Sequence, residues 1–65
     1  MGIGRELKRI RLESKVTQGE LAEMAGISPQ NISDIEREKH LPSAYTLLQI
    51  VDVLGYRIEI VRKGK

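Results

Sequence analysis

Polar side chains recur at helical spacing between residues 28 and 37, and they carry several kinds of hydrogen-bonding group. The set consists of Ser28, Gln30, Asn31, Ser33, Asp34 and Arg37. Hydroxyl, amide, carboxylate and guanidinium groups on one helix surface can both donate to and accept from a partner. The sequence therefore predicts recognition by hydrogen bonding on this segment, not the making or breaking of covalent bonds.

Residue types that support catalysis or metal binding are absent or isolated. The chain has no cysteine and one histidine, His40, so thiolate sites and imidazole clusters are excluded. The nine acidic residues show no paired or metal-ligand spacing, and no nucleophile motif or glycine-rich phosphate loop occurs. We therefore expect no enzyme activity, no metal and no cofactor.

Length and composition indicate one small folded domain. The chain has 65 residues, of which 40% are hydrophobic and 31% charged, a balance typical of a globular domain. A domain of this size buries little surface, and an oligomer is one way to supplement its core. No run of 18 or more apolar residues and no signal peptide is found, so we expect a cytoplasmic protein with no membrane partner.

The charge and the aromatic content narrow the choice of partner. A net charge of +2 and a pI of about 9.2 permit binding to a polyanion but do not require it. Tyr45 and Tyr56 are the only aromatic residues, so the stacking platforms that bind single-stranded nucleic acid are missing. If nucleic acid is the partner, double-stranded DNA is favoured.

Four helices are predicted to position the polar side chains. Apolar residues recur at helical spacing in the first and the fourth. Thr17 and Glu20 have the spacing of a capping box at the start of the second, while Ser28 and Pro29 are typical of a helix N-cap and first helical position. The expected helices span about residues 3–14, 18–25, 29–37 and 44–54.

The second and third helices are separated by a turn of about three residues that begins at Gly26. Glycine adopts the left-handed conformation that ends a helix, so the chain can turn sharply there. The small side chain of Ala22 permits close approach of the two helices, and Ile32 and Ile35 hold the third helix on the core. This is a helix-turn-helix arrangement, with the polar residues facing outward, where base edges in a DNA major groove would lie.

These residues carry a family resemblance. The segment Gln18-Gly19-Glu20-Leu21-Ala22, followed by Gly26-Ile27-Ser28, Ile32 and Ile35-Glu36, resembles the Cro/repressor-type (XRE) helix-turn-helix family. Arg11 and Pro42-Ser43 extend the resemblance over residues 3–54. It implies an all-α, four-helix, repressor-like domain over residues 1–55 that binds double-stranded DNA and regulates transcription.

The resemblance also implies roles for individual residues. Gln30, Ser33 and Asp34 would face the bases, Gln18 would contact a phosphate, and Arg37 would reach a phosphate or a guanine. Arg11 and Glu36 would form a partly buried ion pair. The expected DNA-binding residues are Thr17, Gln18, Ser28, Pro29, Gln30, Asn31, Ser33, Asp34, Arg37, Lys39 and His40.

Two residues depart from the family pattern. Pro29 occupies a groove-facing position where many members carry a hydrogen-bonding side chain, so it can offer only apolar contact, for example to a thymine methyl group. Glu38 stands where the family often has a helix-ending glycine, and its negative charge does not favour binding to phosphates. We therefore expect weaker recognition of a base at Pro29. The residue change at Glu38 also permits a loop conformation that differs from that of the family.

Residues 56–62 have the alternation and the β-branched content of a strand. A lone strand cannot satisfy its own backbone hydrogen bonds, so we predict antiparallel pairing with the same segment of a second copy. Placing Ile58 opposite Ile58 sets Arg57 opposite Glu59 and Tyr56 opposite Ile60, which are favourable pairs. Residues 56–65 would then form a dimerisation strand and tail.

Two alternatives have different partners. The chain could be an antitoxin, whose strand pairs with a toxin protein while its helices bind DNA. It could also be a helix-turn-helix adaptor that binds no DNA, because a fold does not by itself fix a function.

Overall fold

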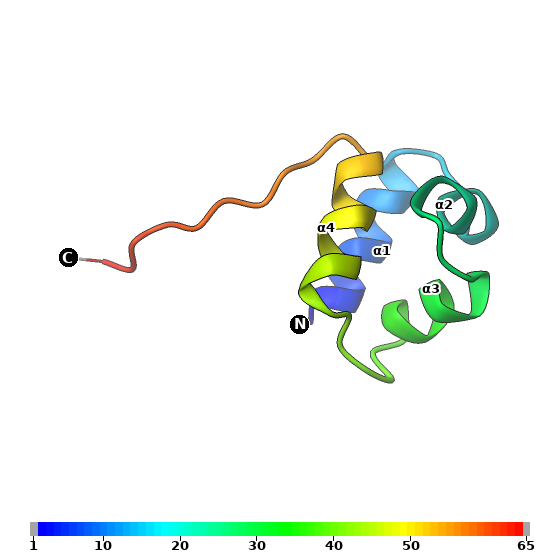
Figure 1. Cartoon of the computed structure of the whole chain (residues 1–65), viewed down its shortest axis with the longest axis horizontal. Helices are drawn as coiled ribbons and strands as arrows, with labels where there is room; N and C mark the ends of the chain where they lie inside the picture. Colours follow the sequence, from blue (N-terminus) through cyan, green and yellow to red (C-terminus); the bar gives the residue numbers. More distant parts are fainter. Residues whose placement is uncertain (1, 65) are drawn as a thin grey trace.

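The computed structural model describes residues 2–64, and these residues form four helices joined by short turns (Figure 1). The helices are α1 (Ile3–Glu13), α2 (Gln18–Ala25), α3 (Pro29–Glu36) and α4 (Ala44–Val53). Their order and approximate bounds are those predicted, except that α1, α3 and α4 each end one residue early, with Ser14, Arg37 and Leu54 as their C-caps. Within this part of the chain, no helix has the length together with the apolar character that crossing a membrane requires.

Side-chain caps begin three of the helices. The Thr17 hydroxyl accepts a hydrogen bond from the backbone N–H of Glu20 at 3.0 Å, and the Glu20 carboxylate accepts one from the N–H of Thr17 at 2.8 Å. Ser28 and Ser43 cap α3 and α4 through their hydroxyl oxygens. A cap of this kind contributes about 1 kcal/mol, so local sequence defines where these helices start.

The ends of α1, α3 and α4 share one turn geometry. Each helix is followed by a residue in the left-handed conformation: Lys15 with φ 60°, Glu38 with φ 62° and Gly55 with φ 88°. After α3, the N–H of Lys39 donates to the carbonyl of Asp34 at 2.9 Å, as in a Schellman motif. Glu38 thus adopts the left-handed conformation that glycine takes most readily.

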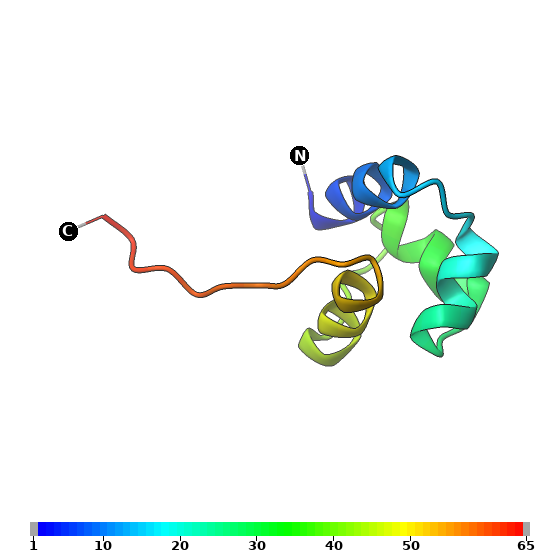
Figure 2. The same ribbon diagram turned by 90° about the horizontal axis from the view of Figure 1, so that it is seen from above.

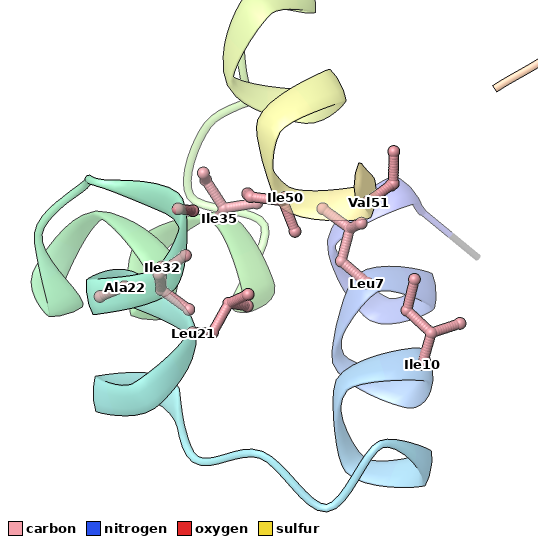
Figure 3. Packing of buried hydrophobic residues seen from close by; sticks show 9 residues of the cluster. Leu7, Ile10, Leu21, Ala22, Ile32, Ile35, Ile50 and Val51 are labelled. Atoms are coloured by element: carbon pink, nitrogen blue, oxygen red, sulfur yellow. The ribbon is translucent and has the colours of Figure 1, made fainter. Parts of the chain in front are cut away.

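A single apolar core fixes how the helices lie relative to one another. Ile32 and Ile35 of α3 are almost completely buried and meet residues of α1, α2 and α4 (Figure 3). The core cluster consists of Leu7, Ile10, Leu21, Ala22, Ala25, Ile32, Ile35, Ile50 and Val51. Because its inner face is held by isoleucines, α3 presents the opposite face to solvent in a fixed orientation.

Gly4 marks the closest approach of α1 to the end of α3. A Cβ atom at this position would lie 2.0 Å from the carbonyl oxygen of Ile35, which is backbone and cannot move aside cheaply. We expect Gly4→Ala to destabilise the domain by at least about 1–3 kcal/mol, the usual cost of overpacking. Thermal denaturation followed by circular dichroism measures the effect.

Gly19→Ala is the matched control, because a Cβ there would meet nothing closer than the Thr17 hydroxyl at 3.9 Å. Alanine is favoured over glycine in helices, so this variant should be neutral or more stable by roughly 0.5–1 kcal/mol. Equal melting temperatures for Gly4→Ala and the parent chain would show that the helices can separate at this point without cost.

Residues 56–62, which were predicted to form a strand by pairing with a second copy, form no strand in the single chain. Residues 2–64 contain no strand, and their fold is all-α. After α4 the segment leaves the helices as an extended chain (Figures 1 and 2). A strand needs a neighbour for its backbone hydrogen bonds, and the helical domain offers none.

Candidate nucleic-acid interface

Three side chains form a connected strip along the exposed face of α3. Gln30, Asp34 and Arg37 lie about one helical turn apart, which brings them to the same face. The Gln30 Nε2 group donates to Asp34 Oδ1 at 2.9 Å, and Arg37 Nη2 lies 3.3 Å from the same oxygen. Gln30 and Arg37 are exposed and Asp34 is half-buried, so the strip presents hydrogen-bond donors and acceptors to solvent.

 The hydrogen bond from Gln30, together with the hydrogen bond and positive charge of Arg37, lowers the pKa of the Asp34 carboxyl group below its usual value. This carboxylate is therefore ionised near neutral pH.

The other predicted residues of α3 surround this strip. Asn31 and Ser33 are half-buried, while Pro29 is exposed in the first turn. The Ser28 hydroxyl accepts a hydrogen bond from the N–H of Asn31 at 3.1 Å, so one of its lone pairs is already used as the N-cap. These positions border the Gln30, Asp34 and Arg37 strip, and the structure leaves their expected contacts with DNA as predictions.

Lys39 and His40 lie in the loop that follows α3, and both are exposed. His40 Nδ1 is 3.2 Å from the carbonyl oxygen of Leu41, a contact within the loop. The loop adds a cationic side chain at the end of α3, next to the strip.

At the start of α2, the side chains of Thr17 and Gln18 are both engaged within the protein. Thr17 is the N-cap, and Gln18 Nε2 donates to Glu36 Oε1 at 2.9 Å. An amide nitrogen carries two hydrogens, so Gln18 retains one donor for another partner. The hydrogen bond to the buried Glu36 carboxylate therefore fixes the orientation of the Gln18 side chain.

Arg11 and Glu36 form a buried ion pair between α1 and α3. Arg11 Nε donates to Glu36 Oε2 at 2.6 Å and Arg11 Nη2 to Glu36 Oε1 at 3.0 Å, while the third nitrogen donates to the Val16 carbonyl at 2.7 Å. The two side chains are only 7% and 3% exposed. The pair therefore ties the end of α3 to α1 and to the loop that leads into α2.

Glu38 has a role that sequence reasoning missed. Its carboxylate accepts a hydrogen bond from the backbone N–H of Arg5 at 3.1 Å, in the first turn of α1. The N-cap of α1 is Gly2, which has no side chain to make this bond. The negative charge of Glu38 thus lies at the positive end of the α1 dipole, where it is stabilising. An uncapped glycine before a helix was the one sequence signal of this contact.

Residues 2–64 contain no group of three His, Cys, Asp or Glu side chains placed to hold a metal ion. What the geometry offers is a rigid, exposed helix with mixed hydrogen-bonding groups, backed by a second helix across the turn at Gly26.

Fold and surface together define a helix-turn-helix domain. Residues 7–61 match the helix-turn-helix family HTH_3, and the chain belongs to this Cro/repressor-type (XRE) family of DNA-binding domains. Domains of this kind occur in a phage repressor and in transcriptional regulators that the chain resembles.

Several known proteins resemble the chain over most of its length. The immunity repressor protein of Bacillus phage phi105 is 39% identical over 61 residues, which are 94% of this chain and 42% of the repressor. An uncharacterized helix-turn-helix-type transcriptional regulator of Sinorhizobium fredii, y4dJ, is 33% identical over 91% of this chain and 78% of its own length. This chain thus spans less than half of the phage repressor.

Two solved structures are also similar. The biofilm master regulator SinR in complex with DNA is 36% identical, with a TM-score of 0.80 over 85% of this chain and 89% of SinR. A complex of SinR with the SinI protein gives 32% identity and a TM-score of 0.76, over 86% of this chain and 55% of the matched chain.

Proposed function

We propose that this protein is a sequence-specific, double-stranded DNA-binding regulator of the repressor type that acts as a homodimer. The observation that carries the proposal is the strip of Gln30, Asp34 and Arg37 on the exposed face of α3. Its side chains match the donors and acceptors of base edges, and the core holds the helix rigidly behind them. The similarity to SinR, whose solved complex contains DNA, supports the same use of the fold.

The roles of the individual residues follow from their places. Gln30, Ser33 and Asp34 would face the bases, Arg37 would reach a phosphate or a guanine, and Lys39 would lie beside the flanking phosphates. Gln18 would contact a phosphate through its remaining amide hydrogen. The other proposed interface residues are Thr17, Ser28, Pro29, Asn31 and His40.

The homodimer is proposed from the surface around the C-terminal segment. Tyr56, Arg57 and Ile58 line two grooves, one of about 420 Å³ against α1 and α4 and one of about 360 Å³ against α4. Apolar side chains of these grooves, among them Tyr56 and Ile58, remain exposed, so an isologous contact with a second copy could cover them. Residues 1–55 would then bind DNA and residues 56–65 would join two copies.

The segment itself is suited to pairing. Ile60 is fully exposed and Val61 is mostly exposed, which leaves apolar surface for a partner to cover. Arg57 and Glu59 form an ion pair of 2.7 Å within one chain. In the antiparallel register, Arg57 of each copy would instead face Glu59 of the other copy. Such a dimer would place its two α3 helices to read half-sites about 34 Å apart.

Selection of bound duplexes from a random pool tests the proposed function. We expect one operator sequence to be enriched, and its affinity to fall steeply with salt because phosphate contacts release counterions. A dimer that contacts about 6–10 phosphates should lose roughly 10³- to 10⁵-fold between about 50 and about 200 mM salt. Filter binding or fluorescence anisotropy measures this dependence.

Gln30→Ala provides the control for specificity. It should weaken binding to the selected operator by roughly 5- to 100-fold, the value of one good base contact, and leave binding to random duplex almost unchanged. An operator affinity that does not change with salt would support a helix-turn-helix adaptor that binds no DNA, and an equal effect on both duplexes would show that Gln30 does not select a base.

A second candidate function keeps the DNA-binding helices but assigns the C-terminal segment to a different protein. The structure of SinR with SinI shows that a relative forms a complex with a protein partner, and an antitoxin bound to its toxin would be of this kind. Sedimentation of the pure chain separates the two candidates, because the homodimer proposal requires a dimer without any added protein.

A further inference from the structure

Asp34 restricts how Gln30 can present its amide group. An ionised carboxylate only accepts hydrogen bonds, so the amide of Gln30 must turn its nitrogen, not its oxygen, toward Asp34. The 2.9 Å bond between Gln30 Nε2 and Asp34 Oδ1 has this geometry. The terminal torsion of a glutamine is otherwise broad and close to two-fold, so a free amide would exchange its two ends readily.

The fixed amide leaves a defined pair of groups for a partner. The Oε1 atom of Gln30 remains an acceptor, and the second hydrogen on Nε2 remains a donor. Adenine is the base whose major-groove edge offers the complementary pair, a donor at N6 and an acceptor at N7. A reversed amide would place a donor where N6 needs an acceptor, and would suit the acceptor oxygens of thymine or guanine instead.

Arg37 supports this arrangement from the other side. Its Nη2 atom lies 3.3 Å from the same Oδ1 atom of Asp34, so the carboxylate is held between the two side chains. Asp34 is the most covered of the three, with a side chain 25% exposed against 57% for Arg37. The central residue is therefore the one that is best placed to hold its neighbours.

We propose that Asp34 is a positioning residue that fixes the amide orientation of Gln30, and that Gln30 held in this way selects adenine at one position of the operator. The inference rests on the proposed function, since it assigns the base that this same helix reads. It predicts that specificity at that position depends on a residue that need not contact the base.

The test compares affinities for four duplexes that differ only at the base pair whose preference disappears in Gln30→Ala. The parent chain should prefer adenine by roughly tenfold or more. Asp34→Ala frees the amide, and Asp34→Asn accepts either amide orientation, because asparagine both donates and accepts. In both variants we expect the preference for adenine to fall by about fivefold or more, as thymine and guanine become acceptable.

Two controls separate positioning from general effects. Glu23→Ala removes one exposed negative charge from α2 and should raise affinity for all duplexes without changing the preference. In the Gln30→Ala background, Asp34→Ala should have no further effect on the preference. The preference is a ratio measured on one protein, so a smaller folded fraction cancels from it.

The outcomes are distinguishable. If the parent chain enriches no duplex, the proposed function fails, and the inference fails with it. If an operator is enriched but Asp34→Ala and Asp34→Asn keep the full preference for adenine, or if the preferred base is not adenine, the proposed function stands and the inference is overturned.

Discussion

Arg11→Met is expected to destabilise the folded domain by about 3–5 kcal/mol, because it leaves the Glu36 carboxylate buried without its cation. Methionine keeps much of the aliphatic volume of arginine, so the loss is that of the charge and its hydrogen bonds. Glu36 would retain one bond, from Gln18, and the carbonyl of Val16 would lose the donor that it now has at 2.7 Å.

The size of this effect must be compared with the stability of a small domain. Globular proteins are stable by about 5–15 kcal/mol, and short chains lie toward the lower end because they bury less surface. A loss of 3–5 kcal/mol, as is typical for a broken buried pair, would therefore unfold a large part of the protein at 37 °C or lower its melting temperature by roughly 15 °C or more. Urea denaturation followed by circular dichroism measures the change.

Arg9→Met is the matched control, since it makes the same substitution two residues away on α1. Arg9 bridges Glu6 and Glu13, but its side chain is 52% exposed, and exposed ion pairs contribute little to stability. The double variant Arg11→Met/Glu36→Leu should regain much of the lost stability, because a buried pair replaced by apolar residues is often neutral. Equal destabilisation by Arg9→Met and Arg11→Met would contradict the argument that breaking the Arg11–Glu36 ion pair is costly because the pair is buried.

The helices could be predicted from the sequence because their start signals are local. Thr17 and Glu20 lie three residues apart and cap α2, and Ser28 and Pro29 begin α3 in the same way. Gly26 ends α2 with φ 73°, a conformation that favours glycine over other residues. Each of these features depends on neighbours within one helical turn, so a sequence pattern is enough to reveal it.

Other features depend on distant residues or on a partner. Arg5 and Glu38 meet although 33 positions separate them, and no spacing rule predicts such a contact. The Arg11–Glu36 pair spans 25 positions, and the family resemblance was the only guide to it. The segment after Tyr56 has the pattern of a strand, but a strand forms only where another strand completes its hydrogen bonds.

The exposed face of α3 could be predicted from the sequence, but the contacts within it were not. Gln30 and Asp34 are four positions apart, a spacing at which an amide and a carboxylate on one helix meet. That spacing was a usable signal for the bond seen between them. Lys15 gave no signal of its left-handed conformation, because charged residues rarely occupy the left-handed position that ends a helix. For Glu38 the only signal was that the family often has a glycine at this position.

Ile58→Asp is expected to convert the proposed homodimer into a monomer and to weaken operator binding by roughly 100-fold or more, because the two domains would no longer bind as one bivalent unit. Ile58 lines both of the grooves next to the C-terminal segment, and it is 44% exposed. In the proposed register it faces itself across the two-fold axis, so two aspartates would set like charges directly opposite each other. Analytical ultracentrifugation of the pure chain, together with operator binding, measures both effects.

The structure supplies a reason why this variant should remain folded. Ile58 lies beyond α4 and outside the core cluster, so the helical circular dichroism signal and the binding to random duplex per domain should change little. Met24→Asp is the matched control, because Met24 is also about half exposed but lies on α2, which contributes no residue to either groove. We expect Met24→Asp to remain dimeric, since the same charge is then added where no second copy is proposed to bind. A dimeric Ile58→Asp protein with full operator affinity would show instead that the two copies, if they join at all, meet on another face of the domain.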